Sequence, residues 1–158
     1  MSNRIKHLCK RLSRSADKAK AYFSGLSPEQ MDQQIYTDGA SWTINQIMAH
    51  FVMAEDGMMR LVARIVETGE GVPEDFDLDS YNEYKASKLK QTSPDQLIEK
   101  FLEAREKTIQ MVSKFEDENL EITGRHPWLG IARVEDIIKL MYRHNQIHQR
   151  EIRDALEC

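Results

Sequence analysis

Four long stretches of this sequence repeat their apolar residues at intervals of three and four, the spacing that places side chains on one face of an α-helix. The stretches are 5–23, 44–65, 97–115 and 134–152, and no part of the chain shows the period-two alternation of a β-strand. Four helices of about 20–25 residues, each about 30–37 Å long, favour packing around one shared core. We therefore predict an all-α fold, a four-helix bundle.

Capping signals set the expected helix bounds. Ser27 is followed by Pro-Glu-Gln and Ser93 by Pro-Asp-Gln, a pattern that starts a helix because the serine side chain accepts a backbone N–H. The first of these predicts a short extra helix in the first connection. The first helix is expected to end before Gly25, the second to run from Thr43 toward Gly69, and the last to run from about Arg133 to Glu157. The third region has two helix starts, at Ser80 and at Ser93. Loops are expected over Gly69–Asp79 and Glu116–Ala132.

Composition limits the classes of partner and location. No biased linker divides the chain, so residues 1–158 are expected to form a single domain. A net charge of −4 gives no global attraction to nucleic acid or to an anionic membrane, and the basic first helix lacks the aromatic residues of a stacking platform. No apolar run reaches the roughly 20 residues that span a bilayer, no signal peptide is evident, and the two cysteines lie near opposite ends. We expect a cytoplasmic protein with no nucleic-acid partner and no membrane contact.

A pair of histidines lies in the last helix. His144 and His148 are four residues apart and occupy the apolar face between Met141 and Ile152. Residues four apart are neighbours on a helix, about 5–6 Å between Cβ atoms, so both imidazoles can reach one ion. A buried polar group without a partner costs about 1–3 kcal/mol, so two such groups together call for a common partner. A metal ion is the simplest one.

The third ligand of a catalytic metal site must come from another helix, because such sites usually take three protein ligands and leave one position open. His50 lies at the shoulder of the apolar stripe of the second helix. Taken alone, His50 is expected to be an ordinary histidine at the edge of the core. Taken together with His144 and His148, it is expected to be the third metal ligand. His126, in the segment before the last helix, is expected to lean over the mouth of this site or to face solvent, and His7 is expected on an exposed face. Imidazole suits Zn, Ni, Fe or Cu, and the ligand set does not choose among them.

Two charged residues on the apolar stripes are further candidates. Glu55 could serve the site as a fourth metal ligand, as an acceptor for a histidine N–H or as a general base. The alternative without a function is a salt bridge to a basic residue on a facing helix. Arg105 is a candidate for binding an anionic group of a substrate through both arms of its guanidinium. Its structural alternative is a surface arginine whose stem packs on apolar residues.

Several catalytic motifs are absent from the sequence. Asn145 stands where the helix of a zinc peptidase carries the glutamate of HExxH, which argues against that class. The Glu-x-x-His pattern of di-iron carboxylate bundles is also missing, as are a Gly-rich phosphate loop and a nucleophile elbow. The sequence thus argues against a zincin-type peptidase and lacks the di-iron, phosphate-loop and nucleophile-elbow motifs.

Two segments, Trp42–His50 and His144–Arg153, resemble the DinB-like superfamily, and the likeness covers essentially the whole chain, with 125–130 also typical. The resemblance implies a four-helix bundle with a three-histidine metal site, one ligand from the second helix and two from the last. These would be His50, His144 and His148. Characterised relatives are metal-dependent S-transferases that use bacillithiol or mycothiol, and a mycothiol-dependent maleylpyruvate isomerase. Relatives often carry His-Asp-x-His-His where this chain has Asn145 and a single closing histidine, so the resemblance does not extend to the substrate.

The expected function is therefore that of a divalent-metal enzyme. The ion would act as a Lewis acid on a low-molecular-weight thiol that attacks a small-molecule electrophile. The alternatives are a metal-dependent hydrolase with Glu55 as the base toward water, and a metal-binding or ligand-binding bundle without turnover.

We also expect a homodimer, as is common in the family that the chain resembles. Val52, Met59 and Val66 form a second apolar line on the second helix, which either packs on a partner or is covered by the Gly69–Asp79 loop.

Overall fold

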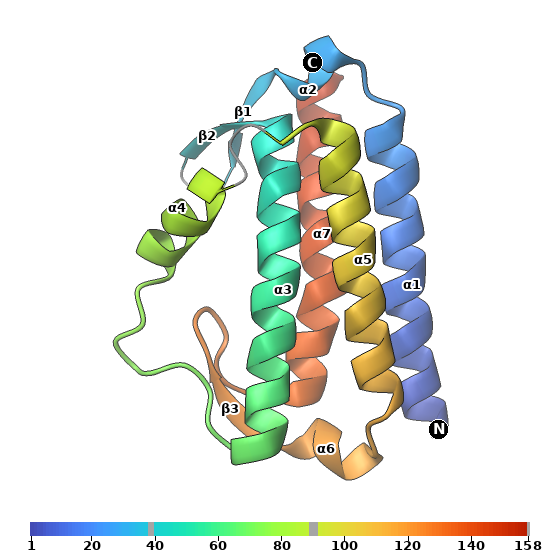
Figure 1. The fold of residues 1–158 in the computed structure, drawn as a ribbon, viewed down its shortest axis with the longest axis vertical. Coiled ribbons are helices and arrows are strands. Elements are labelled where there is room, and N and C mark those ends of the chain that lie inside the picture. Colours follow the sequence, from blue (N-terminus) through green and yellow to red (C-terminus); the bar gives the residue numbers. More distant parts are fainter. Residues whose placement is uncertain (38–39, 89–91, 158) are drawn as a thin grey trace.

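Four long helices lie side by side along the length of the molecule in the computed structural model, which describes residues 1–37, 40–88 and 92–157 (Figure 1). They are α1 (Asn3–Ser24), α3 (Ile44–Thr68), α5 (Pro94–Ser113) and α7 (Val134–Leu156). The predicted four-helix bundle is confirmed.

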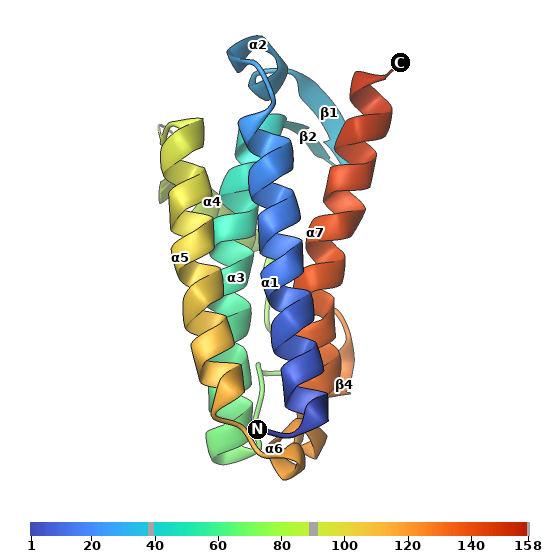
Figure 2. The same cartoon turned by 90° about the vertical axis from the view of Figure 1, so that its right-hand side faces the viewer.

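The order of the helices around the bundle differs from their order in the chain. Helix α1 packs against α5 and α7, and α3 packs against the same two helices. Helices α3 and α5 run in one direction and α1 and α7 in the other, so α3 and α7 are antiparallel neighbours (Figures 1 and 2). The connection from α3 to α5 crosses the length of the bundle and carries α4 (Leu78–Lys88) on its outside (Figure 1).

The capping signals act as expected at four helix ends. Ser27, Thr43 and Ser93 each accept the backbone N–H of the glutamine three residues on, and that glutamine side chain accepts the backbone N–H of the cap in return. The first of these boxes starts the short helix α2 (Pro28–Met31), which was predicted. Gly69 ends α3 with φ of 74°, a conformation that a residue without a Cβ adopts without strain.

The start of α4 differs from the prediction. The helix begins at Leu78, two residues before Ser80. Asp77 takes the capping role, since its Oδ1 accepts the backbone N–H of Ser80 at 3.1 Å and its Oδ2 accepts the Ser80 hydroxyl at 2.7 Å. An aspartate caps as well as a serine does, and here the aspartate stands earlier in the chain.

Two short β-hairpins contradict the expectation that the chain forms no strands. One pairs β1 (Gln34–Thr37) with β2 (Ala40–Thr43), and the other pairs β3 (Thr123–His126) with β4 (Gly130–Arg133), both antiparallel. Burial does alternate along β3, but its buried residues are a glycine and a histidine, so no apolar pattern marks it. The segment Glu116–Ala132, expected to be a loop, also contains the short helix α6 (Asp117–Glu121).

The core is divided into two apolar clusters along the bundle axis. The upper cluster includes Phe23, Phe51 and Phe101, and the lower one includes Leu12 and Tyr142. Between them lie buried polar side chains, which we call the polar layer: Glu55, Arg105, Thr108 and Asn145. Within the described ranges, no helix combines the length and the apolar character needed to span a membrane.

Candidate metal centre

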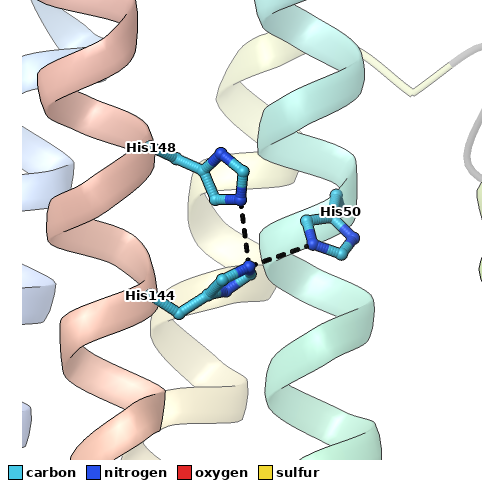
Figure 3. Close-up of side chains that lie close together, drawn as sticks. All are labelled: His50, His144 and His148. Carbon is cyan, nitrogen blue, oxygen red and sulfur yellow. Dashed lines mark hydrogen bonds between the residues drawn. The ribbon is translucent and has the colours of Figure 1, made fainter. Parts of the chain in front are cut away.

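Three histidines from two neighbouring helices point toward one another (Figure 3). His50 comes from α3, and His144 and His148 come from successive turns of α7. The Nε2 atom of His144 lies 3.0 Å from that of His148 and 3.3 Å from that of His50. The structure therefore brings together the three residues that the sequence indicated as a set.

These distances suit three ligands of one ion. Two ligands about 2.0–2.1 Å from a metal and roughly 90–110° apart are separated by about 2.8–3.4 Å, and both Nε2–Nε2 distances fall in this range. One donor atom from each ring lies within 4.8 Å of the others. The donor set and its spacing thus fit a divalent metal ion.

The protonation state of His144 also suits a ligand. Burial lowers the pKa of its imidazole well below the ordinary value of 6.5, and the neighbouring His50, His148 and His126 lower it further by charge repulsion. The ring is therefore neutral at physiological pH, and the neutral imidazole is the form that binds metals.

Aromatic and acidic side chains surround the histidine cluster. The Trp42 ring stands edge-on to His50 with centroids 5.3 Å apart. The Phe51 ring lies 5.7 Å from the ring of His148. Glu151 Oε1 lies 4.0 Å from Nδ1 of His148, the nitrogen that points away from the cluster. A carboxylate beside the outer nitrogen of a ligand histidine orients the ring and raises its basicity.

Glu55 and Arg105 form a buried salt bridge. Arg105 Nε donates to Oε1 of Glu55 at 2.6 Å and its Nη2 donates to Oε2 at 2.9 Å, while both side chains are at most 2 % exposed. The hydroxyl of Thr108 also donates to Oε1, at 2.9 Å. The salt-bridge alternative for Glu55 is thus the one that the structure shows. The alternative of a surface arginine is wrong, because Arg105 is buried; its role in binding a substrate stays a prediction.

Asn145 belongs to the polar layer, although it lies between the two histidines of α7 in sequence. Its Oδ1 accepts a hydrogen bond from Nη2 of Arg105 at 2.6 Å, and its side chain is buried. Successive helical residues are turned by roughly 100°, so Asn145 faces the bundle interior while His144 and His148 face α3. Sequence reasoning treated Asn145 only as a replaced glutamate. Its angular position on the core side of the helix was the signal that could have shown its role.

His126 is buried at the end of β3, so the solvent-facing alternative for it is wrong. Its Nδ1 accepts the backbone N–H groups of Trp128 and Leu129 at 3.0 and 3.1 Å and so closes the turn between β3 and β4. Burial lowers the pKa of this imidazole to about 4. The exposed position expected for His7 on α1 is confirmed.

Comparisons with known proteins agree with this architecture. A family profile described as the DinB superfamily matches residues 11–152. No curated protein matches the sequence. Among solved structures, YfiT from Bacillus subtilis, described as a probable metal-dependent hydrolase with an unusual four-helix bundle topology, has a TM-score of 0.76 at 20% identity, over 98% of this chain and 87% of that one.

Two further solved structures share the fold. The mycothiol-dependent maleylpyruvate isomerase has a TM-score of 0.76 at 10% identity, over 96% of this chain and 63% of that one. The colibactin self-resistance protein ClbS, solved in complex with double-stranded DNA, has a TM-score of 0.73 at 11% identity, over 98% of this chain and 96% of that one. This DNA complex of a protein with a similar fold is in tension with the expectation that the present chain has no nucleic-acid partner.

Proposed function

The chain belongs to the DinB superfamily, and from this premise we propose that it is a metal-dependent enzyme acting on a small molecule, with His50, His144 and His148 as the metal ligands. The observation that carries the proposal is the convergence of three Nε2 atoms at spacings that one ion can bridge. Three neutral imidazoles leave the full charge of a divalent ion uncompensated, which favours Lewis-acid chemistry. Zn, Ni and Fe all suit this ligand set.

The reaction that we favour is the transfer of a low-molecular-weight thiol to an electrophile. A divalent ion held by the three histidines would supply Lewis acidity that lowers the pKa of the thiol. The thiol would lose its proton to solvent, its sulfur would form a bond to the electrophilic carbon, and the leaving group would depart from that carbon with the electron pair of the broken bond. The rings of Trp42 and Phe51 lie against the histidine rings, and the carboxylate of Glu151 lies 4.0 Å from Nδ1 of His148. The similarity in fold to a mycothiol-dependent enzyme supports this choice of nucleophile.

Metal-dependent hydrolysis is the second candidate, and the description of YfiT favours it. In that reaction water replaces the thiol as nucleophile. Glu55 is poorly placed to act as its base, because Arg105 and Thr108 occupy both carboxylate oxygens. A bundle that binds metal without turnover is the third candidate.

The metal site is tested by elemental analysis of protein purified without a nickel column. We expect about one divalent ion per chain, and its loss in His144→Ala and in His148→Ala. His7→Ala is the matched control, because this histidine is exposed on α1, and it should keep the metal. Full occupancy in the double variant of His144 and His148 would rule out the site.

The reaction class is tested by incubating the metal-loaded protein with electrophiles, with and without bacillithiol or mycothiol. Turnover that requires both the thiol and His148 supports the transferase. Turnover without any thiol supports the hydrolase, and no turnover under either condition supports the binding protein.

Location and partners follow from the same proposal. We place the protein in the cytoplasm, because the reaction needs a reduced thiol and thiols are kept reduced there. We propose a small molecule rather than nucleic acid as its substrate, because the proposed reaction takes place at three histidines of which two are buried, and the chain has a net charge of −4.

A further inference from the structure

The polar layer joins all four helices of the bundle through one side chain. Arg105, on α5, donates to Glu55 on α3, to Asn145 on α7 at 2.6 Å and to the carbonyl oxygen of Leu12 on α1 at 2.9 Å. Its Nη2 also lies 3.3 Å from the carbonyl oxygen of Met141 on α7. The guanidinium is planar and its donors point in fixed directions, so these acceptors must hold fixed relative positions.

The same two helices that carry the histidines carry the two acceptor side chains. Glu55 follows His50 by five residues on α3, about 7–8 Å along the helix axis. Asn145 directly follows His144 and precedes His148 by three residues on α7. A rotation of α7 or a slide of α3 would therefore disturb the bonds to Arg105 and the convergence of the histidines together.

We propose that Asn145 is a positioning residue for the metal centre: through its bond to the Glu55–Arg105 pair it fixes the rotation and height of α7 against α3, and so sets the spacing of the three histidines. This inference rests on the proposed metal site. Buried ion pairs are often no more stabilising than apolar residues of similar size, and their best-attested contribution is to fix register between helices.

The test compares two substitutions of nearly equal size. Asn145→Leu removes the acceptor for Arg105, and Asn145→Asp keeps an acceptor oxygen in the same place. We expect Asn145→Leu to fold and to bind Zn²⁺ at least about tenfold more weakly, the scale of loss for groups that orient metal ligands, while Asn145→Asp keeps the wild-type affinity or exceeds it. Affinity is measured on the apo protein by competition with a chelator, after circular dichroism has shown that each variant is folded.

A control separates positioning from stability. Val112 is fully buried on α5 in the lower apolar cluster, two turns beyond Arg105. Val112→Ala should lower the urea midpoint without changing Zn²⁺ affinity or the visible spectrum of the Co²⁺-loaded protein. Asn145→Leu should change that spectrum, because the spectrum reports the geometry of the ligands.

Two outcomes would overturn the inference in different ways, and a third calls for a substitute variant. If the wild-type protein binds no Zn²⁺, the metal site itself is wrong and the positioning role falls with it. If the wild type binds Zn²⁺ and folded Asn145→Leu binds it equally well, the positioning role alone is wrong. If Asn145→Leu does not fold, the double variant Glu55→Met with Arg105→Met, which removes the ion pair as a unit, takes its place; unchanged affinity there also rejects the role.

Discussion

Glu55 and Arg105 meet at the centre of the bundle with almost no exposed surface. Removing one partner of such a pair leaves the other charge buried without compensation, which costs about 3–5 kcal/mol. We expect Arg105→Met to lower the free energy of unfolding by that amount, measured by urea denaturation. The double variant Glu55→Met with Arg105→Met should recover most of the loss, since two apolar side chains replace the pair. A single variant as stable as the wild type would contradict the role of this ion pair.

The burial of His126 leads to a prediction about how the stability of the fold depends on pH. Its pKa is about 4 in the folded protein against an ordinary value of 6.5, because the ring is buried. Between these values the unfolded chain binds a proton that the folded chain does not, so stability should fall as the pH decreases from 6.5 toward 4 and this contribution should level off below 4. Protonation of Nδ1 would also break the bonds from Trp128 and Leu129.

The measurement is urea denaturation of the apo protein across this pH range. His126→Asn, which keeps a short acceptor but does not titrate, should show a shallower dependence than the wild type. His7→Ala, at an exposed position, should follow the wild-type curve. Identical slopes for the wild type and His126→Asn would contradict the assignment.

At the scale of elements, the β3–β4 hairpin is fastened to the loop after α3 by close backbone contact. The N–H of Val72 donates to the carbonyl oxygen of Arg125 at 2.9 Å. A Cβ on Gly71 would lie 2.0 Å from that same oxygen, and a Cβ on Gly124 would lie 2.6 Å from Cγ1 of Ile65. Only glycine permits this approach, so the loop and the hairpin dock as a unit against α3.

Gly71→Ala should therefore separate the loop from the hairpin. Because the clash is with backbone, we expect a loss of about 1–3 kcal/mol in the free energy of unfolding, the usual cost of overpacking. Gly25→Ala is the matched control: its Cβ would meet its nearest neighbour at 3.5 Å, an ordinary contact, so a change within about 0.5 kcal/mol is expected. Equal stability of the two variants would show that the loop is not fastened as described.

At the scale of the whole molecule, the expected dimer stays a prediction. The second apolar line of α3 is partly covered within the monomer, since Val52 packs against the upper cluster and Met59 and Val66 pack against the lower one. Among the described residues, Trp128 and Ile131 on the β3–β4 hairpin are large apolar side chains that stay 66% and 62% exposed in the monomer. Light scattering at micromolar concentration should give a mass near twice 18.4 kDa, and a mass near 18.4 kDa would exclude the dimer.

The sequence by itself determined the helices and most of their ends. Apolar periodicity and capping are local properties, because they depend on side chains within a few residues of one another. For the same reason His144 and His148 could be paired from their spacing alone. His50 could be added to this pair because the periodicity of α3 places it at the edge of the apolar stripe. The sequence did not show which helix α3 would face.

Only the tertiary structure decided which helices are neighbours and what the buried polar groups contact. The connections are long enough to allow several bundle orders, so nothing local specifies that α3 lies beside α7 or that Arg105 reaches both Glu55 and Asn145. Pairings between residues 40 or 50 positions apart depend on how the whole core packs. The β3–β4 hairpin and its turn, held by His126, were missed for a related reason. The backbone of Arg125 in β3 bonds to Val72, a distant residue, and the buried residues of β3 are a glycine and a histidine, so no apolar pattern marks the strand.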